Sequence, residues 1–445
     1  MRLGERLADR FEIEQQVGSG GMGEVFRARD PSTGEAVAVK VIAGSRGPRA
    51  ARFAREVEVL AGLSHPGIVR YISHGETAGG ELYLIMEWLE GEDLSQRLER
   101  APLTAGESVR LALRAAEALG AAHACGIVHR DLKPSNLFLP GGEIEAVKVL
   151  DFGIARREGE TQLTQTGTMI GTPGYMAPEQ ARNHGEVDAR ADVFALGCVL
   201  FMCLTGIQAF EGDSPVSILA KILFGETPRV SALWPEVPEE LDALVARMMA
   251  KEPAHRPSDG ANLAAALAAL GGQAFTATMV PRGPALRAPA ITGGERRFMS
   301  VVLVGAPPAP ASPIAELAPT EPAPALAPTV RVVELAESTE ALRRASKPYG
   351  GRLELLADGS AVVVIEADRQ VATDQAAQAA RCALALRELT RGRPMVVAMG
   401  RTESAIKLPE EDVIDRASRL LLGAAGAAGA AGAAGAAAAP EAGEA

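Results

Sequence analysis

The chain has 445 residues, a length that suggests two or three domains rather than one. Hydrophobic residues make up 47% and charged residues 23%, both within the range of globular proteins, so a wholly disordered chain is excluded. The formal net charge of −11 argues against nucleic-acid binding through bulk positive charge. The four cysteines form no CxxC pair and indicate thiols in a reducing cytoplasm. The charged N-terminus lacks the apolar run of a signal peptide.

Changes in composition along the chain predict five parts. Strand-like and helical patterns alternate up to about residue 271, after which prolines mark a linker and then an irregular second unit. The predicted parts are an N-terminal lead at 1–10, an α+β domain at 11–271, a linker at 272–294, a smaller α+β unit at 295–422 with a Pro/Ala-rich insertion at 305–329, and a flexible Gly/Ala tail at 423–445.

A glycine-rich loop lies between the first predicted strands. Residues 17–25 follow the pattern GxGxxGxV, and residues 25–29 and 35–42 alternate like strands on either side of a turn. In a dinucleotide-binding fold such a loop would open a helix, whereas between strands it can cover a nucleotide. The alternative is an ordinary glycine-rich hairpin that binds no nucleotide. The choice between the two depends on Lys40 in the next predicted strand.

Lys40 stands in the apolar strand Ala-Val-Ala-Val-Lys. It could end an edge strand with its ammonium in solvent, or it could be a fixed cation for nucleotide phosphates. The second role needs a carboxylate to hold the lysine. Glu56, in a predicted amphipathic helix, supplies one.

The strongest motif is His-Arg-Asp-Leu-Lys-Pro-Ser-Asn at 129–136, followed by a predicted hairpin and by Asp-Phe-Gly at 151–153. Asp131 can orient and deprotonate an attacking hydroxyl, and Lys133 can neutralise charge on a transferred phosphoryl group. Asn136 and Asp151 are hard oxygen ligands suited to Mg²⁺. The spacing therefore predicts a phosphoryl-transfer site.

Residues 193–210 form an uncharged run near the length of a membrane span. The run contains Gly197, Gly206 and Gln208 and lacks basic flanks, so we predict a buried core helix and no membrane span.

With these motifs in place, residues 11 to about 270 resemble a eukaryotic-type (Hanks-type) bacterial serine/threonine protein kinase. The resemblance rests on GSGGMGEV, AVAVK, HRDLKPSN, DFG and Ala177-Pro178-Glu179. It implies an α+β fold with a small β-rich lobe and a large helical lobe. It also implies use of ATP and Mg²⁺, which Mn²⁺ could replace, and transfer of the γ-phosphoryl group to serine or threonine of protein substrates, including the chain itself in trans.

The family pattern assigns roles to individual residues. Asp131, Lys133, Lys40 and Glu56 would be catalytic, and Asn136 and Asp151 would bind metal. Met86 matches the gatekeeper, so Glu87 and Leu89 should present backbone groups to adenine. The full set of expected ATP-binding residues is Val17, Gly18, Ser19, Gly20, Gly21, Met22, Gly23, Glu24, Val25, Ala38, Lys40, Met86, Glu87 and Leu89.

Other matches are structural. Asp192 would be the buried aspartate that opens the large helix, Arg256 would pair with Glu179, and Thr172 would lie near Asp131 and Lys133 and favour a Ser/Thr substrate. A catalytically silent nucleotide-binding scaffold is the alternative function, and the intact catalytic pattern argues against it.

The activation segment between Asp151 and Glu179 is rich in threonine. The residues could simply form a solvated loop. However, the LTQT element resembles the phosphorylation sites of bacterial kinases, and Arg130 is a guanidinium suited to hold a phosphate. We therefore expect phosphorylation at Thr164 and Thr166.

Residues 295–422 faintly resemble a class III nucleotidyl cyclase domain, through MSVVLVG, GGRLELLADGSAVVVI, AARCALALR and DVIDRASRLL. Gly305 replaces the family's first metal-binding aspartate and Asp415 its asparagine, while Asp358 and Arg419 match. One carboxylate cannot hold two metal ions. We expect a degenerate regulatory or dimerisation module, with an active cyclase or a chance resemblance as alternatives, and dimerisation could involve either domain.

Overall fold

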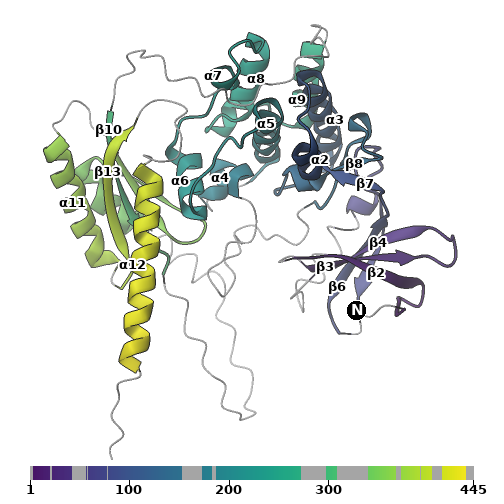
Figure 1. Ribbon diagram of the computed structural model, residues 1–445, viewed down its shortest axis with the longest axis horizontal. Coiled ribbons are helices and arrows are strands. Elements are labelled where there is room, and N and C mark those ends of the chain that lie inside the picture. Colours follow the sequence, from purple (N-terminus) through teal and green to yellow (C-terminus); the bar gives the residue numbers. More distant parts are fainter. Residues whose placement is uncertain are drawn as a thin grey trace, which may run out of the picture.

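The computed structural model describes residues 4–20, 23–42, 57, 59–77, 79–152, 173–182, 187–271, 297–307, 339–366, 372–390, 392–402 and 413–436. The expected site residues that lie outside these ranges are Gly21, Met22, Glu56, Thr164, Thr166 and Thr172. In Figure 1 the described parts form a sheet-rich lobe near the N-terminus, a helical lobe, and a third unit of sheet and helices.

The first lobe is a six-stranded antiparallel sheet in the order β1-β2-β3-β4-β6-β5. Buried residues alternate along β3 and β4, as strands with one buried face require, whereas β6 is buried on both faces. The core on one face of the sheet includes Phe11, Phe26 and Val39. The strands are β1 (Arg6–Leu7), β2 (Phe11–Gly20), β3 (Gly23–Arg29), β4 (Ala36–Ile42), β5 (Tyr71–Glu76) and β6 (Leu82–Glu87). β1, within the lead expected at residues 1–10, pairs with β2.

The second lobe is mainly helical, so the two-lobed arrangement expected from the sequence is confirmed. Its helices are α2 (Leu94–Arg100), α3 (Ala105–Ala124), α4 (Pro178–Ala181), α5 (Ala189–Thr205), α6 (Pro215–Phe224), α7 (Val230–Leu233), α8 (Glu239–Met248) and α9 (Gly260–Gly271). This lobe also contains a small sheet of β7 (Gly91–Asp93), β8 (Leu137–Pro140) and β9 (Lys148–Val149). The motif at 129–136 ends where β8 begins, and Asp151 follows shortly after β9.

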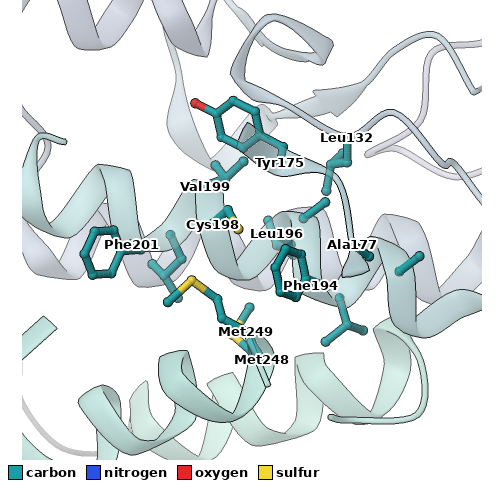
Figure 2. Packing of buried hydrophobic residues seen from close by; sticks show 14 of the residues in the cluster. Leu132, Tyr175, Ala177, Phe194, Leu196, Cys198, Val199, Phe201, Met248 and Met249 are labelled. Atoms are coloured by element: carbon teal, nitrogen blue, oxygen red, sulfur yellow. The ribbon is translucent and has the colours of Figure 1, made fainter. Parts of the chain in front are cut away.

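The membrane-like run forms the buried helix α5 and does not continue as one helix to Phe210. The helix ends at Gly206, whose φ of 78° is the left-handed conformation of a helix C-cap. Figure 2 shows α5 side chains, among them Phe194 and Leu196, packed among Met248 and Met249. A β-carbon added at Gly197 would lie 2.8 Å from that of Met248, so glycine allows this close approach. No helix in the described ranges has the length and apolar character that a membrane span needs.

The third unit is a four-stranded antiparallel sheet in the order β11-β12-β10-β13, flanked by helices. Along the chain it reads β10 (Arg297–Val304), a helix at 339–346, β11 (Arg352–Leu355), β12 (Ala361–Glu366), α11 (Ala372–Leu389), β13 (Met395–Thr402) and α12 (Val413–Ala436). This is the βαββαβ arrangement with a further helix.

Residues 423–436 continue α12, so the flexible tail expected from residue 423 is wrong for this part of the chain. Alanine has the highest intrinsic helix propensity, and here it outweighs the cost of the interspersed glycines.

The two faces of the third unit's sheet have different neighbours. Val302, Val363 and Ile365 pack with Cys382 and Leu386 of α11. Residues on the opposite face join the same apolar cluster as the helical lobe: Val301, Leu303, Val362, Val364 and Ala398, together with Val413, Ile414, Ala417 and Leu421 of α12. The yellow α12 and the sheet therefore dock against the side of the helical lobe that carries α4 and α6 (Figure 1).

Candidate active site

The glycine-rich loop is a hairpin between β2 and β3, as expected, and Gly20 pairs with Gly23 at its described end. Gly23 has a φ of 132°, and a β-carbon there would lie 1.8 Å from the carbonyl oxygen of Val41 on β4. A side chain at this position would therefore prevent the strand from packing. Gly18 has room for one, because the nearest atom, the Val25 β-carbon, would lie 4.0 Å away. The glycine at position 23 is thus required by the sheet itself.

Lys40 lies on β4 with a largely buried side chain, and its Nζ is 2.8 Å from Oδ1 of Asp151. In the strand register Lys40 stands between Val25 of the hairpin and Leu84 of β6. The expected pair with Glu56 lies outside the described residues. Lys40 thus links the small lobe to the aspartate of the second motif.

Asp192, in the first turn of α5, fixes the catalytic loop. Its carboxylate is buried and accepts hydrogen bonds from the backbone N–H groups of His129 (2.7 Å) and Arg130 (2.8 Å), and it contacts Nε2 of His123 at 2.9 Å. Asp192 thus lies in the first turn of the long buried helix, the position that the sequence predicts for it. Arg130 has a φ of 65°, a left-handed conformation that is strained for a residue with a β-carbon, so these contacts hold it in place.

His129 connects the catalytic loop with the segment around Asp151. Its Nε2 is 2.7 Å from the carbonyl oxygen of Leu150, and its ring contacts that of Phe152 with centroids 4.9 Å apart. Asp151 also has a positive φ, of 53°. Arg130 and Asp151, both with positive φ, each follow directly after a residue of the His129–Leu150 contact that joins the two motifs. Strained backbone of this kind is common in functional sites.

The three polar residues of the loop lie together. Nζ of Lys133 is 3.2 Å from Oδ2 of Asp131, and the Asn136 side-chain amide donates to the Asp131 backbone carbonyl at 2.7 Å. That bond uses the amide nitrogen of the buried Asn136, so its oxygen is the atom that can bind a cation. An amide oxygen here and the Asp151 carboxylate fit the oxygen ligands that Mg²⁺ prefers. Within the described ranges, no three His, Cys, Asp or Glu side chains form a metal-binding group.

The expected adenine-binding strand is β6. Met86 is buried and pairs with Ala38 of β4. The Glu87 N–H donates to the Arg70 carbonyl at 3.0 Å, so Glu87 can offer a nucleotide only its carbonyl. Its carboxylate accepts from the Arg70 N–H and from Nζ of Lys148 at 2.7 Å. Sequence reasoning missed Lys148, because nothing local marks a contact that spans 61 residues.

The short helix α4 carries a second set of site contacts. The Arg256 guanidinium pairs with the Glu179 carboxylate at 2.7 and 2.9 Å, the partner that the sequence predicts for it. Gln180, which sequence reasoning missed, donates from Nε2 to the backbone carbonyl of Arg130 at 2.9 Å. The bond joins α4 directly to the peptide that precedes Asp131.

Lys251 is a largely buried lysine whose backbone carbonyl accepts from Arg256, the partner of Glu179. Burial lowers its pKa to about 7, and the nearby charges of Arg182, Arg256 and Arg352 also lower it. Its Nζ donates to the carbonyl of Ile222 at 2.6 Å and lies 4.3 Å from the centre of the Phe210 ring.

The positions matched to cyclase metal ligands do not form a two-metal site. A β-carbon at Gly305 would lie 2.7 Å from Cγ of Pro394, which leaves little room for an aspartate there. The Asp358 carboxylate accepts from both the N–H and the hydroxyl of Ser360 at 2.8 Å, in a local turn. Burial raises the pKa of Asp358 and so disfavours its charged form. These residues do not fit a catalytic metal pair.

Asp415 and Arg419, the other two positions of that resemblance, contact the helical lobe. The buried Asp415 accepts from the N–H of Asp213 at 3.2 Å and pairs with Lys221 of α6 at 2.5 Å. Arg419 pairs with the Asp213 carboxylate at 3.2 Å. Both side chains serve the contact between the third unit and the helical lobe.

Comparison with known proteins agrees with this geometry. Residues 11–268 match the family model described as the protein kinase domain. The serine/threonine-protein kinase PknB of Mycobacterium tuberculosis is 40% identical over 276 residues, which cover 60% of this chain and 44% of that protein. The serine/threonine-protein kinase pkn3 of Myxococcus xanthus is 38% identical over 280 residues, 60% of this chain and 51% of that protein.

The crystal structure of the M. tuberculosis PknI kinase domain superposes with a TM-score of 0.50 at 28% identity, covering 61% of this chain and 99% of that domain. The chain spans about half the length of the curated relatives it matches. The family model covers more than half of the chain, and the loop, the strand lysine and the α4 pair all lie within it. The chain therefore belongs to the protein kinase family, with its kinase domain at residues 11–268.

Proposed function

We propose that the protein is a serine/threonine kinase of bacterial signal transduction that transfers the γ-phosphoryl group of ATP to serine or threonine hydroxyls, including its own. One observation carries the proposal: Lys40 contacts Asp151 at 2.8 Å, while Lys133 and Asn136 both contact Asp131. A nucleotide-binding scaffold without catalysis would not need this complete set.

Each of these residues has a chemical role in the proposed reaction. Asp131 accepts the proton of the attacking hydroxyl, and Lys133 offsets the negative charge that develops on the transferred group. Lys40 holds the phosphates of ATP beneath the β2–β3 hairpin, and the backbone of Glu87 and Leu89 contacts adenine. Asn136 and Asp151 would hold Mg²⁺, or Mn²⁺ in its place, and the ion would supply positive charge that offsets the charge of the phosphates.

The activation segment would set substrate class and regulation. We propose that Thr172 and Lys133 shape a groove for a short hydroxyl side chain, and that Thr164 and Thr166 are phosphorylated in trans. Arg130 would then bind the new phosphate, because a guanidinium and a phosphate form strong paired hydrogen bonds. These threonines lie outside the described residues, so the proposal rests on the sequence.

We further propose that residues 295–422 are a degenerate cyclase-like domain without cyclase activity. The βαββαβ order of the sheet supports the relationship, and the surroundings of Gly305 and Asp358 argue against catalysis. Dimerisation through either domain remains a prediction. Most apolar side chains of β12 and several of α11 are buried within the chain, whereas Leu384 and Leu389 of α11 are exposed. The cytoplasmic location also remains a prediction, based on the cysteine content.

Incubation of the full chain with γ-labelled ATP and Mg²⁺, followed by phosphosite mapping, tests the proposed function. The wild-type chain should label itself and a general protein acceptor. The matched Asp131→Asn chain, which keeps the shape of the side chain but not its basicity, should label neither. Equal labelling by both chains would contradict the assignment of Asp131.

A further inference from the structure

We propose that Gln180 positions the catalytic loop and that the third unit, residues 297–436, holds Gln180 in place through its contacts with the C-terminal end of α4 and with the region around α6. The inference rests on the proposed kinase activity, because it concerns how fast that reaction proceeds. Gln180 acts through the Arg130–Asp131 peptide and is a positioning residue.

The first step is the bond between Gln180 and the loop. The Arg130 N–H donates to Asp192 at 2.8 Å, and its carbonyl accepts from Gln180 at 2.9 Å. A strained conformation such as the φ of 65° at Arg130 persists only when its surroundings over-determine it. The accepting carbonyl belongs to the same peptide plane as the Asp131 nitrogen. Gln180 therefore fixes the backbone from which the proposed base projects.

The second step is the short length of α4. The helix has four residues, too few to be stable without tertiary contacts. At its start the Gln180 side chain also accepts from the Ala177 N–H at 3.0 Å, so this one side chain caps the helix and binds the loop. The neighbouring Glu179 is held by Arg256. The orientation of Gln180 thus depends on how both ends of α4 are anchored.

The third step is that the third unit supplies the anchor at the far end. The carbonyl of the buried Ala181, the last residue of α4, accepts from the Ala357 N–H at 3.0 Å. The carbonyls at a helix end have no partner within the helix, so an external donor stabilises the end. The next residue, Arg182, pairs with Glu354 of β11 at 3.3 Å, and both side chains are partly buried.

A second contact region keeps the unit docked. Asp415 of α12 is buried and is held by Lys221 and the Asp213 N–H, and the hydroxyls of Ser214 and Ser418 are hydrogen-bonded. Buried polar groups of this kind are tolerated because they are satisfied, and they require the two surfaces to keep one relative position. A continuous series of contacts therefore runs from the third unit through α4 to Asp131.

The test uses variants of the full chain. Gln180→Glu keeps the acceptor for the Ala177 N–H but removes the donor to the loop. Arg182→Ala and Glu354→Ala each remove the ion pair between Arg182 and Glu354, while the backbone bond from Ala357 to Ala181 remains. Glu354→Ala also removes the longer pair of Glu354 with Arg343, at 3.9 Å. The control is Arg344→Ala, which removes an exposed pair with Glu340 in the same unit.

We expect kcat to fall about 2- to 30-fold for Gln180→Glu, Arg182→Ala and Glu354→Ala, with the KM for ATP and the melting temperature unchanged. The control should match the wild type. Because Arg182 and Glu354 act through one contact, the double variant should lose no more than the stronger single variant. Additive losses, or a rise in KM without a fall in kcat, would overturn the proposal.

Hydrogen exchange gives a readout that does not depend on activity. The Asn136 amide, which donates to Lys133 within the loop, and the Ala181 amide, which donates to Ala177, should exchange faster in Glu354→Ala than in the wild type and in Arg344→Ala. Unchanged exchange at Asn136 would overturn the coupling even if the wild-type chain proved inactive. If the wild-type chain proved inactive but Asn136 exchanged faster in Glu354→Ala than in the wild type, the result would support the coupling and contradict only the proposed function.

Discussion

The guanidinium of Arg256 is fully buried and forms two hydrogen bonds with the carboxylate of Glu179. It also donates to the backbone carbonyls of Arg190, Lys251 and Ala250 and packs 5.0 Å from the centre of the Phe194 ring. Every charged group in this pair thus has a partner. The pair ties the end of the activation segment to α5 and to the chain after α8.

Glu179→Ala should lower the free energy of unfolding by about 3–5 kcal/mol, because it leaves a buried guanidinium without its counter-ion. Urea denaturation followed by circular dichroism measures this change. As a control, Arg110→Ala removes a pair with Glu145 in which both side chains are half exposed, and it should cost less than about 1 kcal/mol. Equal costs for the two variants would contradict the structural role of the buried pair.

Lys40→Met and Asp151→Asn should each lower kcat by about two orders of magnitude or more while the fold stays intact. Each removes an electrostatic contact to phosphate or metal that strengthens in the transition state. Steady-state phosphotransfer measures kcat, and circular dichroism confirms folding. A folded variant with near wild-type rates would show that the site is assigned to the wrong residues.

Phosphate should be found on Thr164 and Thr166 of the active chain and should be absent from the Asp131→Asn chain. Mass spectrometry of both proteins tests this. The Thr164→Ala, Thr166→Ala double variant should be less active, because the phosphates can no longer order the segment on Arg130. Full activity of that variant would remove the regulatory role while leaving the modification itself in place.

Lys251 should make stability depend on pH. The folded side chain loses its proton above about pH 7, whereas the unfolded one keeps it to about 10.5. Between these values the unfolded state binds more protons, so the free energy of unfolding should rise with pH, by up to about 1.4 kcal/mol per unit. Below about pH 7 Lys251 is protonated in both the folded and the unfolded state, so its effect on the free energy of unfolding no longer changes with pH.

Urea denaturation at pH 7, 8 and 9 checks the Lys251 prediction. The stability difference between the wild type and Lys251→Met should change steadily in favour of the wild type as the pH rises. The exposed Lys347→Met variant should follow the wild type at every pH. Parallel curves for the wild type and Lys251→Met would show that Lys251 has an ordinary pKa in the folded protein.

The full chain should make no cyclic AMP from ATP with either Mg²⁺ or Mn²⁺. The surroundings of Gly305 and the local hydrogen bonds of Asp358 leave no pair of carboxylates for two metal ions. The assay is best done on the Asp131→Asn chain, so that phosphotransfer does not consume the ATP. Metal-dependent cyclic AMP formation would overturn this description of the third unit.

The sequence predicted those parts of the site that are encoded by contiguous motifs. Asp131, Lys133 and Asn136 lie within six residues, so one loop places all three, and their positions follow from the chain itself. Asp192 and the Glu179–Arg256 pair could be assigned because their neighbours in sequence match a family pattern. The two-lobed fold followed from the same resemblance.

The sequence did not predict contacts between distant segments that no family pattern covers. Arg182 and Glu354 are 172 residues apart, and no periodicity links a charged residue after a short helix with another in a β-strand. The bond between Gln180 and Arg130 was missed for the same reason, since glutamine is common on exposed helix surfaces. The helical end of α12 was missed because repeated Gly and Ala were interpreted by composition rather than by alanine's helix propensity.

Because α6 and α12 belong to one chain, their contact forms at the effective concentration set by the covalent connection, which for tethered partners is on the order of millimolar. Contacts among Asp213, Lys221 and Asp415 that would be too weak to join two dilute proteins can therefore keep the unit docked. Proteolytic cleavage between residues 272 and 296 would change this intramolecular equilibrium into a bimolecular one. The association of the two fragments would then depend on dilution, although every contact in the interface remained available.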